Sequence, residues 1–137
     1  MKQELEEQLI AKYKSFFRDA RQNNPGTTPQ TSCMFWGLDV GDGWYNILDS
    51  ACRLIESHEL HNAPAEYQPA SAAQVKEKFG GLRLYIRGGD EYVEGVIAMA
   101  ELMSEKTCEI CGAPGHIRGR GWLACRCDDC EGTHKSI

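Results

Sequence analysis

The chain has 137 residues, of which 42% are hydrophobic and 26% charged, a composition typical of one soluble domain of ordinary size. No apolar run approaches the roughly 20 residues of a membrane-spanning helix, and segment 1–7 is acidic and lacks the apolar stretch of a secretion signal. We therefore expect a cytoplasmic protein without membrane contact. The formal net charge of −5 excludes a whole-molecule attraction to nucleic acid but leaves room for a local basic face.

Residues 2–22 are predicted to form an amphipathic helix. Apolar residues recur at spacings of four, four, three and four, which places them on one helix face. These residues are Leu5, Leu9, Tyr13, Phe16 and Ala20. The breaker cluster Asn23-Asn24-Pro25-Gly26 ends this helix, and segment 23–32 is expected to be a polar linker.

A second helix is predicted to begin near Asp42 and to end near Leu60. Gly41-Asp42-Gly43 supplies a turn and a carboxylate that can cap the helix N-terminus. The apolar stripe of this helix consists of Trp44, Ile47, Leu48, Ala51 and Ile55. Cys52 lies beside the stripe and is expected to be a small core residue. His58-Glu59-Leu60-His61 is one residue short of the spacing of a metalloprotease helix, so we interpret it as a solvated helix end.

Residues 75–86 are predicted to form a β-hairpin. Two alternating runs, 75–79 and 82–86, flank Gly80-Gly81, and such a pair suits a two-residue turn with positive φ. The core-facing side chains of the second run would be Leu82, Leu84 and Ile86. In the alternative interpretation, segment 71–79 forms a helix that ends at Gly80.

A last helix is predicted from an Asp90 cap to about Lys106. Its core-facing residues would be Val93, Val96, Ile97, Ala100 and Met103. The order of helix, helix, hairpin and helix predicts an α+β domain over residues 1–106, in which three helices pack on a small antiparallel sheet.

The remaining segment, 107–137, is predicted to bind zinc. The chain has seven cysteines, an odd number that argues against a complete set of disulfides, and five of them lie between residues 108 and 130. Cys108-Glu109-Ile110-Cys111 is followed, after fifteen residues, by Cys127-Asp128-Asp129-Cys130, which matches a zinc template closely. Two residues between ligands allow a tight turn to aim both thiolates at one ion. With a short strand at 122–124, the segment would resemble a zinc ribbon or a treble clef.

The predicted ligands are Cys108, Cys111, Cys127 and Cys130. Cys125 is an alternative third ligand, because residues 125 and 127 would point to the same side of a strand; we favour Cys127, which completes the spacing. His116 and His134 are reserve ligands, although each is interpreted as a solvated loop histidine. Four thiolates leave no open position for water, so the predicted zinc site is structural rather than catalytic.

A basic patch is predicted on the outward face of the hairpin. Segment 74–87 holds four basic residues and one acidic residue, whereas segment 33–60 holds five acidic residues and one basic residue. The predicted patch consists of Lys76, Lys78, Arg83, Tyr85 and Arg87. Tyr85 among cations could stack on a nucleic-acid base or anchor a protein interface. A solvated hairpin face is equally compatible with the pattern.

Known catalytic motifs are missing from the sequence. It contains neither the His-x-Glu of zinc deaminases nor a phosphate-binding P-loop. An enzyme is therefore the less favoured interpretation, with a hydrolase built around Asp42, Trp44 and Lys76 as the remaining catalytic alternative.

Three motifs stand out: residues 41–48 (GDGWYNIL), residues 74–85 (QVKEKFGGLRLY), and residues 108–115 (CEICGAPG) with Gly121-Trp122. In these motifs the chain resembles a family of small uncharacterised proteins found in phages, prophages and bacterial genomes. The resemblance covers residues 38–130 and leaves the first helix outside. In the family pattern the last metal position can be histidine; here it is Cys130. The resemblance implies a phage context, in which small acidic proteins often occupy a host protein such as a defence complex.

Two functional hypotheses follow. The leading one is a non-enzymatic, zinc-stabilised protein that binds a host protein. The alternative is a nucleic-acid-binding zinc module that uses hairpin 74–87 together with Arg118, Arg120 and Arg126.

Overall fold

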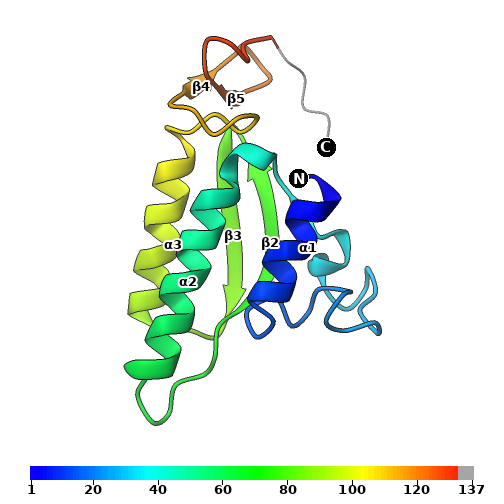
Figure 1. Ribbon diagram of the computed structural model, residues 1–137, viewed down its shortest axis with the longest axis vertical. Helices are drawn as coiled ribbons and strands as arrows, with labels where there is room; N and C mark the ends of the chain where they lie inside the picture. The colour runs from blue at the N-terminus through cyan, green and yellow to red at the C-terminus, as the bar shows by residue number, and fades with distance from the viewer. Residues whose placement is uncertain (133–137) are drawn as a thin grey trace.

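A computed structural model describes residues 1–132 of the chain. The helices and strands pack as three helices against a three-stranded sheet, with a small hairpin at one end (Figure 1). In chain order the elements are α1 (Gln3–Lys12), η1 (Cys33–Trp36), β1 (Leu38–Asp39), η2 (Asp42–Trp44), α2 (Tyr45–His61), β2 (Ser71–Lys78), β3 (Gly81–Arg87), α3 (Glu91–Ser104), β4 (His116–Arg118) and β5 (Ala124–Arg126). This arrangement confirms the predicted α+β class. In the described part of the chain, every helix is too short or too polar to cross a membrane.

The first helix is shorter than predicted, because α1 ends at Lys12 and not at residue 22. Tyr13 leaves the helical conformation with a φ of −122°, and its hydroxyl donates to Asp49 Oδ1 at 2.6 Å. Residues 13–23 then form turns, in which the Asn23 amide donates to two backbone carbonyl groups. The predicted apolar face is buried except for the half-buried Leu5.

The main sheet has the strand order β1–β2–β3. Strands β2 and β3 form the predicted antiparallel hairpin, and this pairing excludes the alternative helix over 71–79. Strand β1 pairs in parallel with β2, with Leu38 opposite Val75 and Asp39 opposite Lys76. The sequence pattern does not predict β1, since two residues are too few to show a periodicity.

The hairpin turn consists of Phe79 and Gly80, one residue earlier than the predicted Gly80-Gly81. Lys78 pairs with Gly81, so two residues connect the strands. Phe79 and Gly80 have φ values of 54° and 85°, as a type I′ turn requires. Phe79 is the one residue other than glycine with a positive φ in the described part of the chain, and its side chain is 65% exposed.

Replacing Phe79 with asparagine is expected to stabilise the fold. Asparagine tolerates the left-handed conformation that costs a residue such as phenylalanine about 1–2 kcal/mol, so we expect a gain of about 1 kcal/mol in the free energy of unfolding. Urea titration measures this gain. Phe79→Leu is the matched control, because leucine keeps the backbone strain. Equal stabilities of the two variants would contradict the prediction.

Helix α2 begins close to the predicted position, but the predicted cap is wrong. The Asp42 carboxylate accepts a hydrogen bond from the backbone N–H of Lys2 at 2.7 Å, and the α2 N-cap residue makes no side-chain cap bond. Helix α3 does begin with its predicted cap, since Asp90 Oδ1 accepts a hydrogen bond from Val93 N at 3.1 Å.

His58 is buried, so its interpretation as part of a solvated helix end is wrong. Its Nε2 lies 2.7 Å from Asp90 Oδ2, and its ring stacks on Tyr92 at a centroid distance of 4.2 Å. The hydrogen bond from this imidazole lowers the pKa of Asp90. His58 thus links the second half of α2 to the start of α3.

The core lies between the helices and the sheet (Figure 1). Cys52 is buried there as predicted, and burial raises the pKa of its thiol. Met103, predicted to face the core, is instead 46% exposed. The neighbouring Ser104 takes the buried position, where its hydroxyl accepts a hydrogen bond from Leu82 N at 2.9 Å. Helix α3 is therefore rotated so that part of its apolar surface faces outward.

Candidate metal centre

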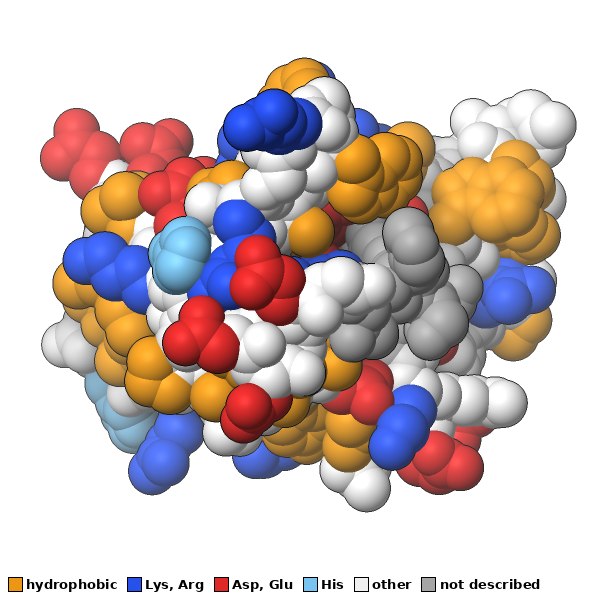
Figure 2. Space-filling view, turned by 90° about the horizontal axis from the view of Figure 1, so that it is seen from above, with side chains coloured by type: hydrophobic (Ala, Val, Ile, Leu, Met, Phe, Trp, Pro, Cys, Tyr) orange, Lys and Arg blue, Asp and Glu red, His pale blue; other side chains and the backbone are white. Residues whose placement is uncertain are grey.

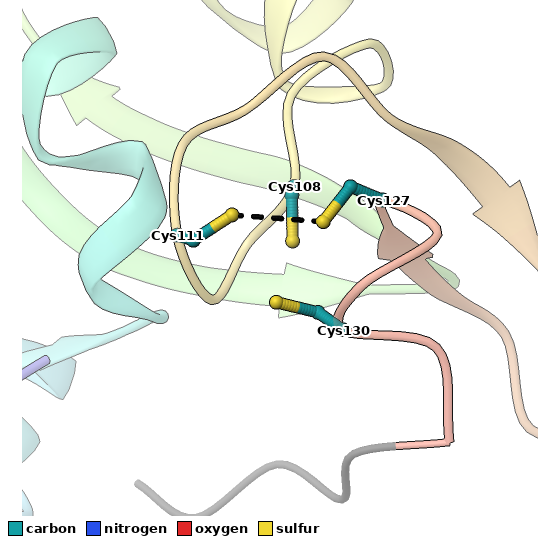
Figure 3. Close-up of side chains that lie close together, drawn as sticks. All are labelled: Cys108, Cys111, Cys127 and Cys130. Atoms are coloured by element: carbon teal, nitrogen blue, oxygen red, sulfur yellow. Dashed lines mark hydrogen bonds between the residues drawn. The ribbon is translucent and has the colours of Figure 1, made fainter.

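The structure brings the side chains of Cys108, Cys111, Cys127 and Cys130 together (Figure 3). Their four Sγ atoms all lie within 4.8 Å of one another, and Cys111 Sγ is 3.6 Å from Cys127 Sγ. Four sulfurs placed tetrahedrally at about 2.3 Å from a zinc ion lie about 3.8 Å apart. The cluster could therefore hold a metal ion, and its donor set suits zinc.

Each cysteine pair lies in a tight turn. In the first, Gly112 N donates to Cys108 O at 2.9 Å, and Gly112 has the positive φ of 82° that such a turn needs. In the second, Cys130 N donates to Cys127 O at 3.2 Å. These turns let two side chains from each segment converge on one point.

A short hairpin connects the two turns. Strands β4 and β5 pair antiparallel, with Ile117 opposite Cys125, and return the chain to the second cysteine pair. The strand predicted at 122–124 actually begins at Ala124, while Trp122 lies in the connecting loop and is 72% exposed. The sequence does not predict β4, because this strand has only three residues and is followed by Gly119, a pattern typical of a loop.

The thiol pKa values within the cluster differ. Burial raises the pKa of Cys108, but hydrogen bonds from the backbone N–H groups of Cys111 and Cys127 outweigh it and lower the value to about 7. The hydrogen bond with the Cys127 side chain, with some burial, raises the pKa of Cys130 to about 12. Without metal the cluster thus favours a thiolate at Cys108, and metal binding has to displace protons from its neighbours.

Cys125 lies outside the cluster and is fully buried. Its Sγ donates to the backbone carbonyl of Glu105 at 3.4 Å, and burial raises its pKa. The strand argument that made Cys125 a rival of Cys127 does not apply, because β5 ends at Arg126 and Cys127 already belongs to the following turn. Of the two reserve ligands, His116 lies in β4 beside Arg118, and His134 lies outside the described residues.

The first cysteine turn docks on η2, the short helix that directly precedes α2. Gly43 N donates to Glu109 O at 2.8 Å, and Trp44 Nε1 donates to Thr107 O at 2.9 Å. A Cβ atom at Gly43 would lie 2.0 Å from Cys108 O, and one at Gly41 would lie 2.2 Å from Glu109 O. The glycines of the GDGW motif therefore permit a close approach of two backbone segments, a role that differs from the predicted turn before a helix.

Glu109 is the residue of this contact that the sequence does not reveal. Its side chain is 1% exposed, Oε2 accepts a hydrogen bond from Gly41 N at 2.9 Å, and Oε1 lies 3.5 Å from Arg126 Nη1. The Arg126 side chain is 4% exposed and also donates to Cys125 O at 2.9 Å. A buried carboxylate thus joins the first cysteine turn, β5 and the start of η2.

The predicted basic patch lies on one face of the hairpin. Lys76 is opposite Arg83 in the β2–β3 register, and its Nζ lies 5.8 Å from the ring centroid of Tyr85. Lys78 lies over the Phe79 ring at 5.5 Å. Arg87, at the far end of the hairpin, pairs with Asp19 at 3.5 Å. Two of the four cations thus lie near aromatic rings, Lys76 at Tyr85 and Lys78 at Phe79, and Arg87 is partly neutralised.

Two of the three arginines of the cysteine-rich segment face acidic groups, so they are less available to bind a partner than expected. Arg118 contacts Asp128 at 3.2 Å and Glu131 at 3.1 Å, while Arg126 faces the buried Glu109. Among the described residues, Arg120 is the one of the three without an ion pair. Figure 2, a view from this end of the molecule, shows acidic and basic side chains next to one another.

The polar cluster proposed for a hydrolase finds no support in the geometry. Asp42 accepts a hydrogen bond from Lys2, and the indole of Trp44 donates to Thr107, so each has its partner elsewhere. Lys76 lies on the hairpin face beside Tyr85. In comparisons with known proteins, no family model, curated protein or solved structure matches the chain.

Proposed function

We propose that this chain is a non-enzymatic, zinc-stabilised binding module of phage or prophage origin, which acts by binding a host protein such as a defence component. The observation that carries this proposal is the closed cluster of four sulfurs. A zinc ion held by all four has no position for water or substrate, so its contribution is to the structure. The zinc-binding segment would then resemble a zinc ribbon or a treble clef.

The hairpin face is the surface that we assign to the partner. Lys76 lies opposite Arg83 and 5.8 Å from the ring centroid of Tyr85, whose side chain is 44% exposed. An exposed tyrosine among cations combines an apolar anchor with charge steering, which is common at protein interfaces. The partner would present acidic side chains to this face.

A nucleic acid is the second candidate partner, because the same face could follow a phosphate backbone while Tyr85 stacks on a base. Two observations weaken this alternative. The chain carries a net charge of −5, and two arginines expected to extend the basic surface are engaged by acidic groups.

A pull-down from a bacterial host lysate, with and without nuclease, tests the proposal. We expect the wild-type chain to retain a host protein after nuclease treatment. The variant Lys76→Glu/Arg83→Glu should lose it, and the control Lys14→Glu, which alters an exposed lysine outside the hairpin, should keep it. Retention of the partner by the hairpin variant would reject this surface.

Titration with short DNA and RNA at low and moderate salt separates the two partners. Micromolar binding that weakens steeply with salt and disappears in the variant Arg83→Ala/Arg87→Ala would favour the nucleic-acid module. We expect weak binding that is equal in the wild-type chain and this variant.

A further inference from the structure

Helix α3 has a second apolar face that the described residues leave uncovered. Its inward face buries Val93 and Ile97, whereas Met99 and Leu102 on the outer face are 62% and 59% exposed. Tyr92, at the start of the outer face, stacks one side of its ring on His58 and is still 46% exposed. Together with Gly95, these outer residues follow spacings of three, four and three, which form one stripe along the helix. A helix that is apolar on opposite faces is normally covered on both.

The stripe is interrupted at Gly95, which has no side chain. Glycine weakens the interior of a helix, and here the chain itself gives no reason for it, since a Cβ atom at Gly95 would meet nothing within 4 Å. Ala98, also exposed, is the next small residue along this side of the helix. The surface therefore has two small residues, Gly95 and Ala98, followed by two large ones, Met99 and Leu102.

The surroundings of α3 leave room for a second molecule. Figure 1 shows α3 at the edge of the molecule with α2 beside it. A shallow cavity of about 300 Å³ between the two helices continues the stripe and is lined by Leu54, Val96 and Met103, among others. Leu54 and Met103 are 48% and 46% exposed, so the apolar surface is wider than one helix.

A second copy of α3 complements this surface. If two α3 helices pack antiparallel about a two-fold axis between Ala98 and Met99, Leu102 of each copy lies beside Gly95 of the other. Large side chains then meet small ones, as close helix packing requires. The same axis brings the exposed Glu91 of each copy towards the exposed Lys106 of the other. A parallel arrangement would instead place Glu91 of one copy against Glu91 of the other, and these two side chains repel each other.

We propose that this chain forms a homodimer through antiparallel contact of two α3 helices, with Leu102 of each copy seated at Gly95 of the other. The contact is isologous, so each complementary pair occurs twice. A helix pair covers less than the roughly 800 Å² per partner of standard interfaces, so the dimer should dissociate on dilution. The proposal is independent of the metal and of the host partner.

Sedimentation velocity of the full, zinc-loaded chain from about 1 μM to about 1 mM tests the dimer. We expect the average mass to rise with concentration from 15.3 kDa towards twice that value. Leu102→Glu should raise the dissociation constant at least about tenfold, because it places a charge in an apolar contact. The control Trp36→Glu changes a 68% exposed side chain of η1, away from α3, and should leave the dissociation constant unchanged.

Two further variants test the arrangement itself. Gly95→Leu should raise the melting temperature of the dilute monomer, since leucine favours helix, and yet weaken the dimer by filling the position of Leu102. Glu91→Lys and Lys106→Glu should each weaken the dimer, and the double variant should restore it.

A monomer at all concentrations, or a dimer insensitive to Leu102→Glu, would overturn the proposal. Binding of this face to a different protein by a chain that remains monomeric would also overturn it.

Discussion

Replacing Cys111 with serine is expected to abolish zinc binding and to unfold segment 107–132. Structural zinc sites in small modules supply on the order of 10–16 kcal/mol of apparent binding free energy, comparable to the roughly 5–15 kcal/mol of a whole domain. The segment contains two short strands and little apolar surface of its own, so the metal should decide whether it folds. Cys111 is the most informative choice, since its side chain is exposed and lies outside the hydrophobic core.

Elemental analysis and amide spectra measure this outcome. The wild-type chain should contain one zinc ion per molecule, and the Cys111→Ser variant none, with the amide signals of 107–132 collapsing towards unfolded positions. Two controls separate loss of a ligand from loss of a thiol. Cys33→Ser changes another exposed thiol, and Cys125→Ala changes the buried rival of Cys127, so both should retain the metal. Zinc-free wild-type protein with a folded segment would contradict the prediction.

The long elements are predictable from the sequence because their side chains repeat along the chain. The 3.6-residue period marks α2 and α3, and alternation with a nearby glycine pair marks the β2–β3 hairpin. The end of α1 is different. The apolar period continues to Ala20, but tertiary hydrogen bonds of Tyr13 and Asn23 stabilise turns in place of a longer helix. These hydrogen bonds cannot be predicted from a local sequence pattern, because they join residues that are apart in the sequence.

The cysteine cluster is predictable for a separate reason. Metal ligands impose a fixed local spacing. The pairs Cys108–Cys111 and Cys127–Cys130 can therefore be recognised in the sequence without any knowledge of the fold. The contact beneath the cluster is not predictable, since it joins residues 41–43 to residues far along the chain. Glutamate side chains are mostly exposed, and only the tertiary structure shows that Glu109 is buried.

Replacing this buried residue, Glu109→Gln, is expected to lower the free energy of unfolding by about 3–5 kcal/mol, because it removes one charge of a buried ion pair and keeps the other, on Arg126, in the interior. Glutamine is nearly isosteric and can still accept the hydrogen bond from Gly41 N, so the loss reports the charge rather than the volume. Urea unfolding of the zinc-loaded protein measures the change.

The matched control is Glu131→Gln, which removes the carboxylate of an ion pair with Arg118 at a 63% exposed position and should cost at most about 1 kcal/mol. The double variant Glu109→Gln/Arg126→Met should recover much of the lost stability, because it removes the buried positive charge as well. If Glu109→Gln costs no more than Glu131→Gln, the buried pair does not hold the cysteine turn on η2. The docking would then depend on the backbone contacts of Gly41 and Gly43 alone.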